Sequence, residues 1–217
     1  MKREELVVKP AVLSDFQENA YIVAAVGSND CVVIDPGMDP EPLLAALQES
    51  NLTPRAFLIT HGHWDHIGGL EKMKELWPDA PIIISALERY KLTDPAGNLS
   101  AAFGFPSTVP DADRILNEGD SLSVAGLDFH VGQIPGHARG HLFFQLDLED
   151  GPVLFVGDII FDGSIGRSDF PDSNGQDLID GIKKKIMTLP DETILYPGHG
   201  GATTIGIQRF SNPWLRA

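Results

Sequence analysis

The sequence has one cysteine and few basic residues. Cys31 cannot form a disulfide within the chain, and its apolar setting, Cys31 to Asp35, predicts a buried strand residue rather than a nucleophile. The 16 lysines and arginines are outnumbered by 31 aspartates and glutamates, which gives a formal net charge of −15. Because no dense basic tract offsets this charge, the composition argues against binding to nucleic acid or to an anionic membrane surface.

Long apolar runs are also missing. No stretch approaches the ~20 apolar residues that a membrane-spanning helix needs, and the start, Met1 to Glu5, has no apolar core for a signal peptide. We therefore expect a cytoplasmic protein. With 217 residues, 42% of them hydrophobic, the chain is predicted to form one globular domain over residues 1–217.

What the sequence does contain is a cluster of histidines, His61 to His66. These six residues hold three of the chain's seven histidines together with a carboxylate. They directly follow the apolar run Ala56 to Thr60, which predicts a buried strand. A histidine-rich surface loop is the alternative, but the segment is internal and has no low complexity. Imidazole and carboxylate bind zinc, iron(II) or manganese, so the cluster indicates a metal site.

Strand-like and helix-like runs alternate along the chain without a linker, which favours a layered α/β sandwich. Strands are expected over residues 20–26, 31–35, 56–60, 81–84, 128–134, 142–146, 152–156 and 193–196. Helices are expected over residues 39–50, 67–77, 86–92 and 177–189, and after Thr203. The segment 94–113 is rich in proline and glycine and is a candidate for covering a substrate, with a passive connector as the alternative.

Three further metal-competent side chains follow predicted strands. His137 comes after Pro135-Gly136, Asp158 after Gly157, and His199 after Pro197-Gly198. Taken singly, each pattern is more typical of an ordinary turn residue. Because open α/β sheets place ligands at the carboxyl ends of their strands, the four strand ends together predict one shared site.

The number of candidate ligands exceeds what one ion can use, which points to two metal ions. If one carboxylate, Asp158, bridges them, each ion has three further ligands and an open position for water. Such a water would have its pKa lowered from ~15.7 toward ~7, which gives hydroxide at neutral pH. The seven candidates are His61, His63, Asp65, His66, His137, Asp158 and His199.

These motifs resemble the complete motif set of the metallo-β-lactamase superfamily. That resemblance implies a four-layer αβ/βα sandwich, in which His61, His63 and His137 hold metal 1, Asp65, His66 and His199 hold metal 2, and Asp158 bridges. Other segments resemble the glyoxalase II (hydroxyacylglutathione hydrolase) branch in a compact form, without its helical C-terminal region. They include Asn19 to Tyr21, Val33 to Gly37, Ile160 to Asp169, and Gly198 to Gly206 with Asn212-Pro213.

The implied reaction is hydrolysis of a small-molecule acyl thioester such as S-lactoylglutathione. The bridging hydroxide would attack the carbonyl carbon, and Asp65 is expected to orient it. Zinc is the expected metal at both positions, with iron or manganese as alternatives. Arg139 departs from the family pattern after His137 and is either a substrate-binding cation at the pocket edge or an exposed loop arginine.

Three other functions remain open. A lactonase that acts on acylated signals resembles this ligand set, and a persulfide dioxygenase resembles the fold but holds a single iron. A non-enzymatic zinc module is disfavoured, because it would close its coordination sphere with four ligands. Outside the ligand set, His141 is expected to be structural and His130 to face solvent. Arg167 and Asp169 are expected to form a structural pair that supports the loop after Asp158, with contact to the substrate as the alternative.

Overall fold

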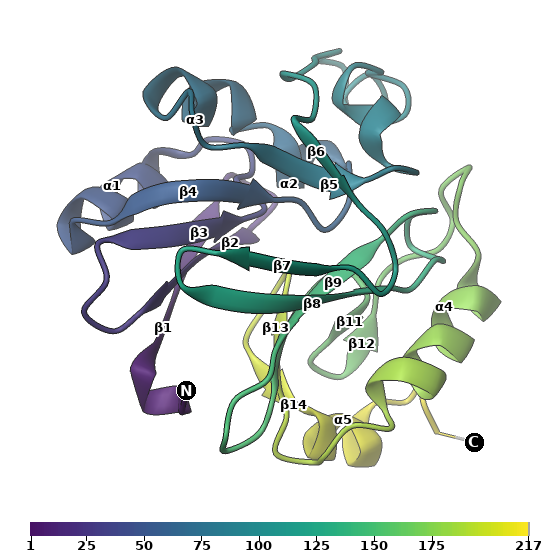
Figure 1. The fold of residues 1–217 in the computed structure, drawn as a ribbon. Coiled ribbons are helices and arrows are strands. Elements are labelled where there is room, and N and C mark those ends of the chain that lie inside the picture. The colour runs from purple at the N-terminus through teal and green to yellow at the C-terminus, as the bar shows by residue number, and fades with distance from the viewer. Residues whose placement is uncertain (217) are drawn as a thin grey trace.

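The computed structural model describes residues 1–216 and contains two six-stranded sheets that pack face to face (Figure 1). The first sheet has the order β1 (Leu6–Leu13), β2 (Glu18–Ala25), β3 (Asp30–Ile34), β4 (Thr53–Leu58), β5 (Ile82–Ser85) and β6 (Arg114–Leu116). The second has the order β14 (Thr203–Thr204), β13 (Ile194–Pro197), β10 (Val153–Gly157), β9 (Leu142–Leu146), β8 (Leu127–Gln133) and β7 (Ser121–Val124). A short ribbon pairs β11 (Ile160–Phe161) with β12 (Ser164–Ile165).

The strand directions bring the predicted ligands to one edge. Strands β3, β4, β5 and β6 are mutually parallel, so the segment after β4 leaves the first sheet at their common carboxyl end. In the second sheet, β10 is parallel to β13, and both β8 and β10 are antiparallel to β9. The carboxyl ends of β8, β10 and β13 therefore also share one edge, from which His137, Asp158 and His199 follow.

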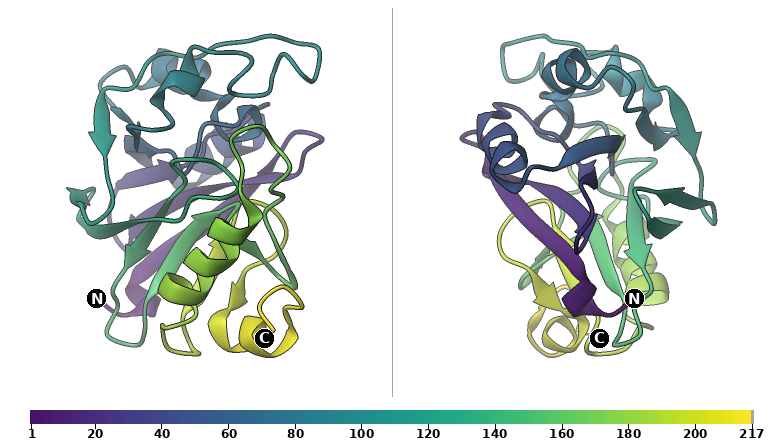
Figure 2. Two further views of the ribbon diagram at one scale, coloured as in Figure 1. Left: turned by 90° about the vertical axis from the view of Figure 1, so that its right-hand side faces the viewer. Right: turned by 60° about the vertical axis from the view of Figure 1, so that its left-hand side comes forward.

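Apolar side chains alternate between the two faces of each sheet. In β3, Val32 and Ile34 face the second sheet, whereas Val33 faces the helices outside the first sheet. Helices α1 (Glu41–Ser50) and α3 (Leu70–Leu76) cover that outer face, and α4 (Gly175–Gly181) and α5 (Ile205–Ser211) cover the outer face of the second sheet (Figures 1 and 2). The predicted four-layer αβ/βα sandwich is confirmed.

Several predicted elements differ in detail. The helix expected over 67–77 is divided into α2 (Trp64–Ile67) and α3, because the amide of Gly69 donates to the carbonyl of Pro36 and the carbonyl of Asp65 accepts from the amide of Met38, so that Gly69 and Asp65 do not form a helical hydrogen bond. The helix expected over 86–92 is only a 3-10 turn, Arg89–Leu92. Helix α4 continues as a single π-helical segment, Ile182–Ile186. Strand β1 was not predicted, since it contains a proline, which an edge strand tolerates.

Cys31 lies in β3 with no exposed surface, as predicted. None of the helices within residues 1–216 combines the length and the apolar composition required to span a bilayer.

Candidate metal centre

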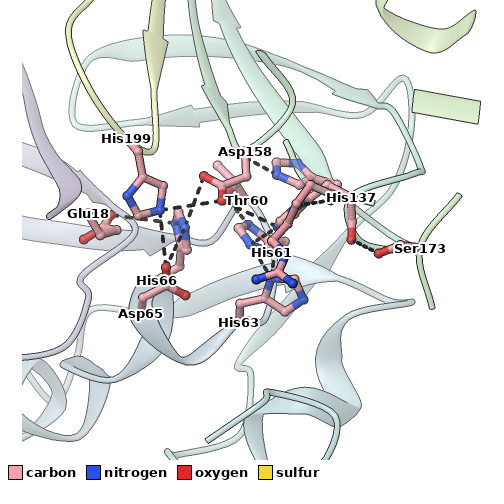
Figure 3. A network of polar contacts seen from close by, with 12 residues as sticks. Glu18, Thr60, His61, His63, Asp65, His66, His137, Asp158, Ser173 and His199 are labelled. Carbon is pink, nitrogen blue, oxygen red and sulfur yellow. Dashed lines mark hydrogen bonds and ion pairs between the residues drawn. The ribbon is translucent and has the colours of Figure 1, made fainter. Parts of the chain in front are cut away.

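The seven candidate ligands converge at the shared strand edge (Figure 3). They come from both sheets: the segment 61–66 follows β4 and leads into the short helix α2, and the other three residues follow strands of the second sheet. Glycine is favoured beside them, because a Cβ atom at Gly198 would clash with Oδ1 of Asp158. The Pro-Gly turn before His199 therefore lets the chain pass close to the carboxylate.

Three imidazole nitrogens form a compact triangle. The distance from His61 Nε2 to His63 Nδ1 is 3.0 Å, and His137 Nε2 lies 3.2 Å and 3.0 Å from these two atoms. Tetrahedral zinc with Zn–N bonds of about 2.0–2.1 Å separates its nitrogen ligands by roughly 3.3 Å. The triangle therefore has the size of one face of a metal coordination sphere.

A second group of donors lies beside the first. His66 Nε2 is 3.7 Å from Oδ2 of Asp65, and His199 Nε2 is 3.3 Å from the same oxygen. This group contains two histidines and one carboxylate, a donor set that suits zinc, iron or manganese.

Asp158 lies between the two groups. Its Oδ2 is 3.5 Å from His137 Nε2 on one side and 3.6 Å from His199 Nε2 on the other, while Oδ1 is 3.4 Å from His66 Nε2. Both Oδ1 of Asp158 and Nε2 of His66 are buried and have no hydrogen-bond partner among the described residues. Buried polar atoms are rarely left without a partner, and these two are satisfied if they bind a cation. The residues fit two divalent ions that share Asp158.

The electrostatics match this assignment. Burial lowers the pKa of His61, His63 and His137, so all three rings are neutral and have a lone pair to donate. For His66, burial alone would lower the pKa, but the carboxylates of Asp65 and Asp158 outweigh it and raise the pKa. That excess of negative charge is what a divalent cation would neutralise.

Asp35 supports the second group from behind, a role that the sequence did not reveal. Its Oδ2 accepts from Nδ1 of His66 at 3.0 Å and from the hydroxyl of Thr60 at 2.6 Å, and its Oδ1 accepts from the amide of Thr60 at 2.7 Å. These contacts fix the orientation of the His66 ring. Glu18 is buried near the same nitrogen, 3.7 Å away, and burial raises its pKa.

His141 acts in a similar way on the bridging residue. Its Nε2 accepts from the backbone N–H of Asp158 at 3.0 Å, its Nδ1 donates to the carbonyl of Leu142 at 2.9 Å, and its ring stacks on His61. The expected structural role for His141 fits this position. His130 is exposed, as expected.

A cluster of charged side chains lies next to the loops of the histidine triangle and was not predicted. The carboxylate of Glu88 accepts from the amides of Gly62 and Gly140, at 3.0 and 2.7 Å, and thereby links the two loops that carry the histidine triangle. Lys91 lies between Glu88 and Asp172, at 3.0 and 2.7 Å. In the sequence, Glu88 and Lys91 have the spacing of an ordinary surface pair, so only the structure identifies them.

A chamber of about 410 Å³ opens directly onto both groups of ligands. Arg167 lies in its wall and pairs with Asp169 as expected, at 2.7 Å. Leu99 and Phe103 of the segment 94–113 also lie in the wall, so this segment does contact the site. Arg139, by contrast, is exposed and is not one of the residues that line the chamber.

Comparison with known proteins identifies the family. The Metallo-beta-lactamase superfamily profile matches residues 13–199. Hydroxyacylglutathione hydrolase GloC of Haemophilus influenzae is 36% identical over 212 residues, which cover 93% of this chain and 94% of the relative. The crystal structure of the B3 metallo-beta-lactamase BLEG-1 is 37% identical with a TM-score of 0.91, covering 97% and 100% of the two chains. A di-iron-bound form of TTHA1623 is 37% identical with a TM-score of 0.83, covering 96% and 100%. Since the profile spans most of the chain and the fold agrees, the chain belongs to the metallo-β-lactamase superfamily.

Proposed function

We propose that the protein is a two-metal hydrolase of acyl thioesters, with S-lactoylglutathione as the reference substrate. The observation that carries the proposal is the position of Asp158 between two complete sets of three donors. When bound, two ions would supply an activated water and polarise the substrate carbonyl. The relationship to hydroxyacylglutathione hydrolase GloC supports the thioester as the substrate class.

The residues of the chain contribute the orientation of the reacting groups. Asp65 faces the chamber and is proposed to orient the attacking water. A C–O bond to the carbonyl carbon forms and the C–S bond breaks, and the thiolate leaves with the bonding electron pair. Because a thiol has a pKa of about 8.5, the leaving group needs no proton donor at neutral pH.

Arg139 is proposed to contact the anionic part of a substrate beyond the chamber. The Arg139→Ala variant should have a higher KM for anionic thioesters and an unchanged KM for neutral ones. If the variant and the unaltered protein have the same KM for anionic thioesters, Arg139 does not have this role. The KM of the Arg139→Ala variant is compared with that of an Arg167→Ala variant, because Arg167, unlike Arg139, lies in the chamber wall.

The test of the proposed function combines metal analysis with a hydrolysis panel. Zinc, iron and manganese are measured per chain in the purified protein. Turnover is measured on S-lactoylglutathione, a neutral acyl thioester, an acyl-homoserine lactone and a cephalosporin, and oxygen consumption is measured with a persulfide. Two ions per chain with preference for thioesters would support the proposal. Preference for the cephalosporin would favour a β-lactamase instead, a candidate raised by the likeness to BLEG-1. One iron with oxygen consumption on a persulfide would favour a dioxygenase.

A further inference from the structure

The chamber beside the metal centre has a predominantly apolar wall. Arg167 is the only lysine or arginine among the residues that line it, and its guanidinium is already occupied. It forms two hydrogen bonds with the Asp169 carboxylate, at 2.7 and 2.8 Å, and lies 4.4 Å from the ring centre of Phe170. The apolar side chains of the wall are Phe16, Leu99, Phe103, Phe161, Ile165 and Phe170.

Two loops that are distant in sequence meet over this wall. Phe16 lies in the turn between β1 and β2, and Phe103 lies in the segment 94–113; their rings pack edge to face with centroids 5.1 Å apart. Figure 2 shows the purple turn and the teal segment at the same side of the molecule, away from both termini. Phe103 is half exposed, with 50% of its surface accessible, and Phe105 stacks beside it. A cluster of aromatic side chains left partly open to water is typical of a binding site.

The base of the second loop is held rigidly. Asn98 is fully buried. Its side-chain amide donates to the backbone carbonyls of Lys91 and Ser107 at 3.0 Å each. Its backbone carbonyl accepts from the backbone N–H of Trp64 at 2.9 Å. The next residue, Leu99, has a φ of 71°, which a bulky side chain rarely adopts. Strained residues of this kind persist where the surroundings enforce them and are common in binding sites. Leu99 is therefore held in the chamber wall.

A second groove of about 400 Å³ adjoins the chamber through three shared residues, Ser164, Ile165 and Arg167. It continues past Ser168 and Asp169 toward Trp214. Its lining combines the hydroxyls of Ser164 and Ser168 with the apolar side chains of Ile165 and Trp214, and the Arg167–Asp169 pair lies along it. The site thus has an aromatic compartment at the metal ligands and an adjoining groove of mixed polar and apolar character outside it.

We propose that the apolar chamber binds the acyl group of the thioester and that the outer groove receives the thiol arm. The preferred substrates are then thioesters of medium-length aliphatic or aryl acids rather than of small hydroxy acids. A chamber of about 410 Å³ is large enough for such a group, since a buried apolar cavity of about 150 Å³ already holds a benzene molecule. The proposal rests on the thioesterase function proposed above and specifies its substrate class.

The experiment compares acyl groups on one thiol. Acetyl, D-lactoyl, butanoyl, hexanoyl and phenylacetyl thioesters of glutathione are assayed with the metal-loaded protein. We expect kcat/KM to rise by about fourfold for each added methylene, the rate factor that corresponds to about 0.8 kcal/mol of apolar burial. The hexanoyl and phenylacetyl compounds should exceed the lactoyl compound by at least tenfold.

The Phe103→Ala and Phe16→Ala variants should each lower the ratio of hexanoyl to acetyl kcat/KM by about tenfold, and Phe103→Leu should restore part of it. The matched control is Phe210→Ala, because this side chain is 84% exposed on α5. This variant should leave the ratio unchanged.

A general folding defect would lower all rates together and would not change the ratio. Hydrolysis with no dependence on acyl length, or with lactoyl as the best acyl group, would overturn this inference and leave the thioesterase function intact. Turnover of none of the thioesters would reject both.

Discussion

Lys91 and Glu88 form an ion pair inside the protein, with 3.0 Å between Nζ and Oε2 and no exposed surface on either side chain. Glu88 in turn holds the loops of the histidine triangle through two backbone amides. Breaking a buried pair leaves an uncompensated charge in the interior, which costs far more than losing a surface pair. The pair therefore links the stability of the fold to the geometry of the first three ligands.

Replacing Lys91 with methionine should lower the free energy of unfolding by about 3–5 kcal/mol, because the carboxylate of Glu88 stays buried without its partner. Urea denaturation of the metal-free protein measures this change. The exposed Lys72→Met variant, which loses only a surface contact with Glu75, should leave the denaturation midpoint unchanged. Equal midpoints for the two variants would contradict the role of the buried pair.

Replacing Asp158 with alanine should abolish binding of two ions per chain and lower thioester turnover by several orders of magnitude. The carboxylate faces candidate ligands of both groups, so its removal takes a donor from each proposed ion. Metal content and kcat/KM are measured on the same preparation. Asp128→Ala removes an exposed carboxylate from β8 and serves as the control. If the Asp158→Ala protein still binds two ions per chain and stays active, Asp158 does not bridge the ions.

The Asp35→Asn variant should weaken the binding of the ion at His66 by about 10- to 100-fold and affect the ion at the histidine triangle less, because Asp35 reaches that triangle only through Thr60. Asparagine keeps the shape of the side chain and tolerates the φ of 49° at this position, but it replaces the anionic partner of His66 with a neutral amide. Competition with a chelating dye resolves the two affinities. Asp30→Asn, which alters an exposed pair with Arg55, should change neither affinity. Equal weakening of both ions would argue against a contact specific to His66.

The Cys31 thiol should not react with thiol reagents at about pH 8 in the folded protein, because burial raises its pKa to about 12. Unfolding in guanidinium should expose one reactive thiol per chain. The unfolded thiol ionises near its ordinary pKa of about 8.5, so above that pH the folded state holds more protons. The thiol's contribution to the free energy of unfolding therefore falls from about pH 8.5 to about pH 12. Rapid labelling of the folded protein would contradict this burial.

The convergence of the candidate ligands could be predicted from the sequence because its information is local. His137, Asp158 and His199 each follow an apolar run and a glycine turn, and the parallel direction of their strands brings them to one edge. The four-layer architecture followed from the alternation of strands and helices together with the family resemblance. Helix ends were less predictable, since the expected helix is interrupted where the amide of Gly69 donates to the carbonyl of Pro36, far earlier in the chain.

The remaining parts of the site depend on contacts between distant segments. Nothing in the sequence around Phe16 indicates that its ring meets Phe103. Lys91 has the sequence surroundings of a solvated lysine, although the fold encloses it completely. Such roles depend on how the loops cross above the sheets, and local patterns of hydrophobicity and turn residues carry no information on that crossing.

The aromatic contact between Phe16 and Phe103 has an evolutionary consequence. Both rings come from loops, whereas the seven candidate ligands follow the strands of two tightly packed sheets. Mutations in the turn 14–17 or at the tip of the segment 94–113 can therefore alter which compounds are accepted without disturbing the reactive centre. Selection can act on the two loops separately from the chemistry, so new specificities can arise in this scaffold while its reaction is conserved.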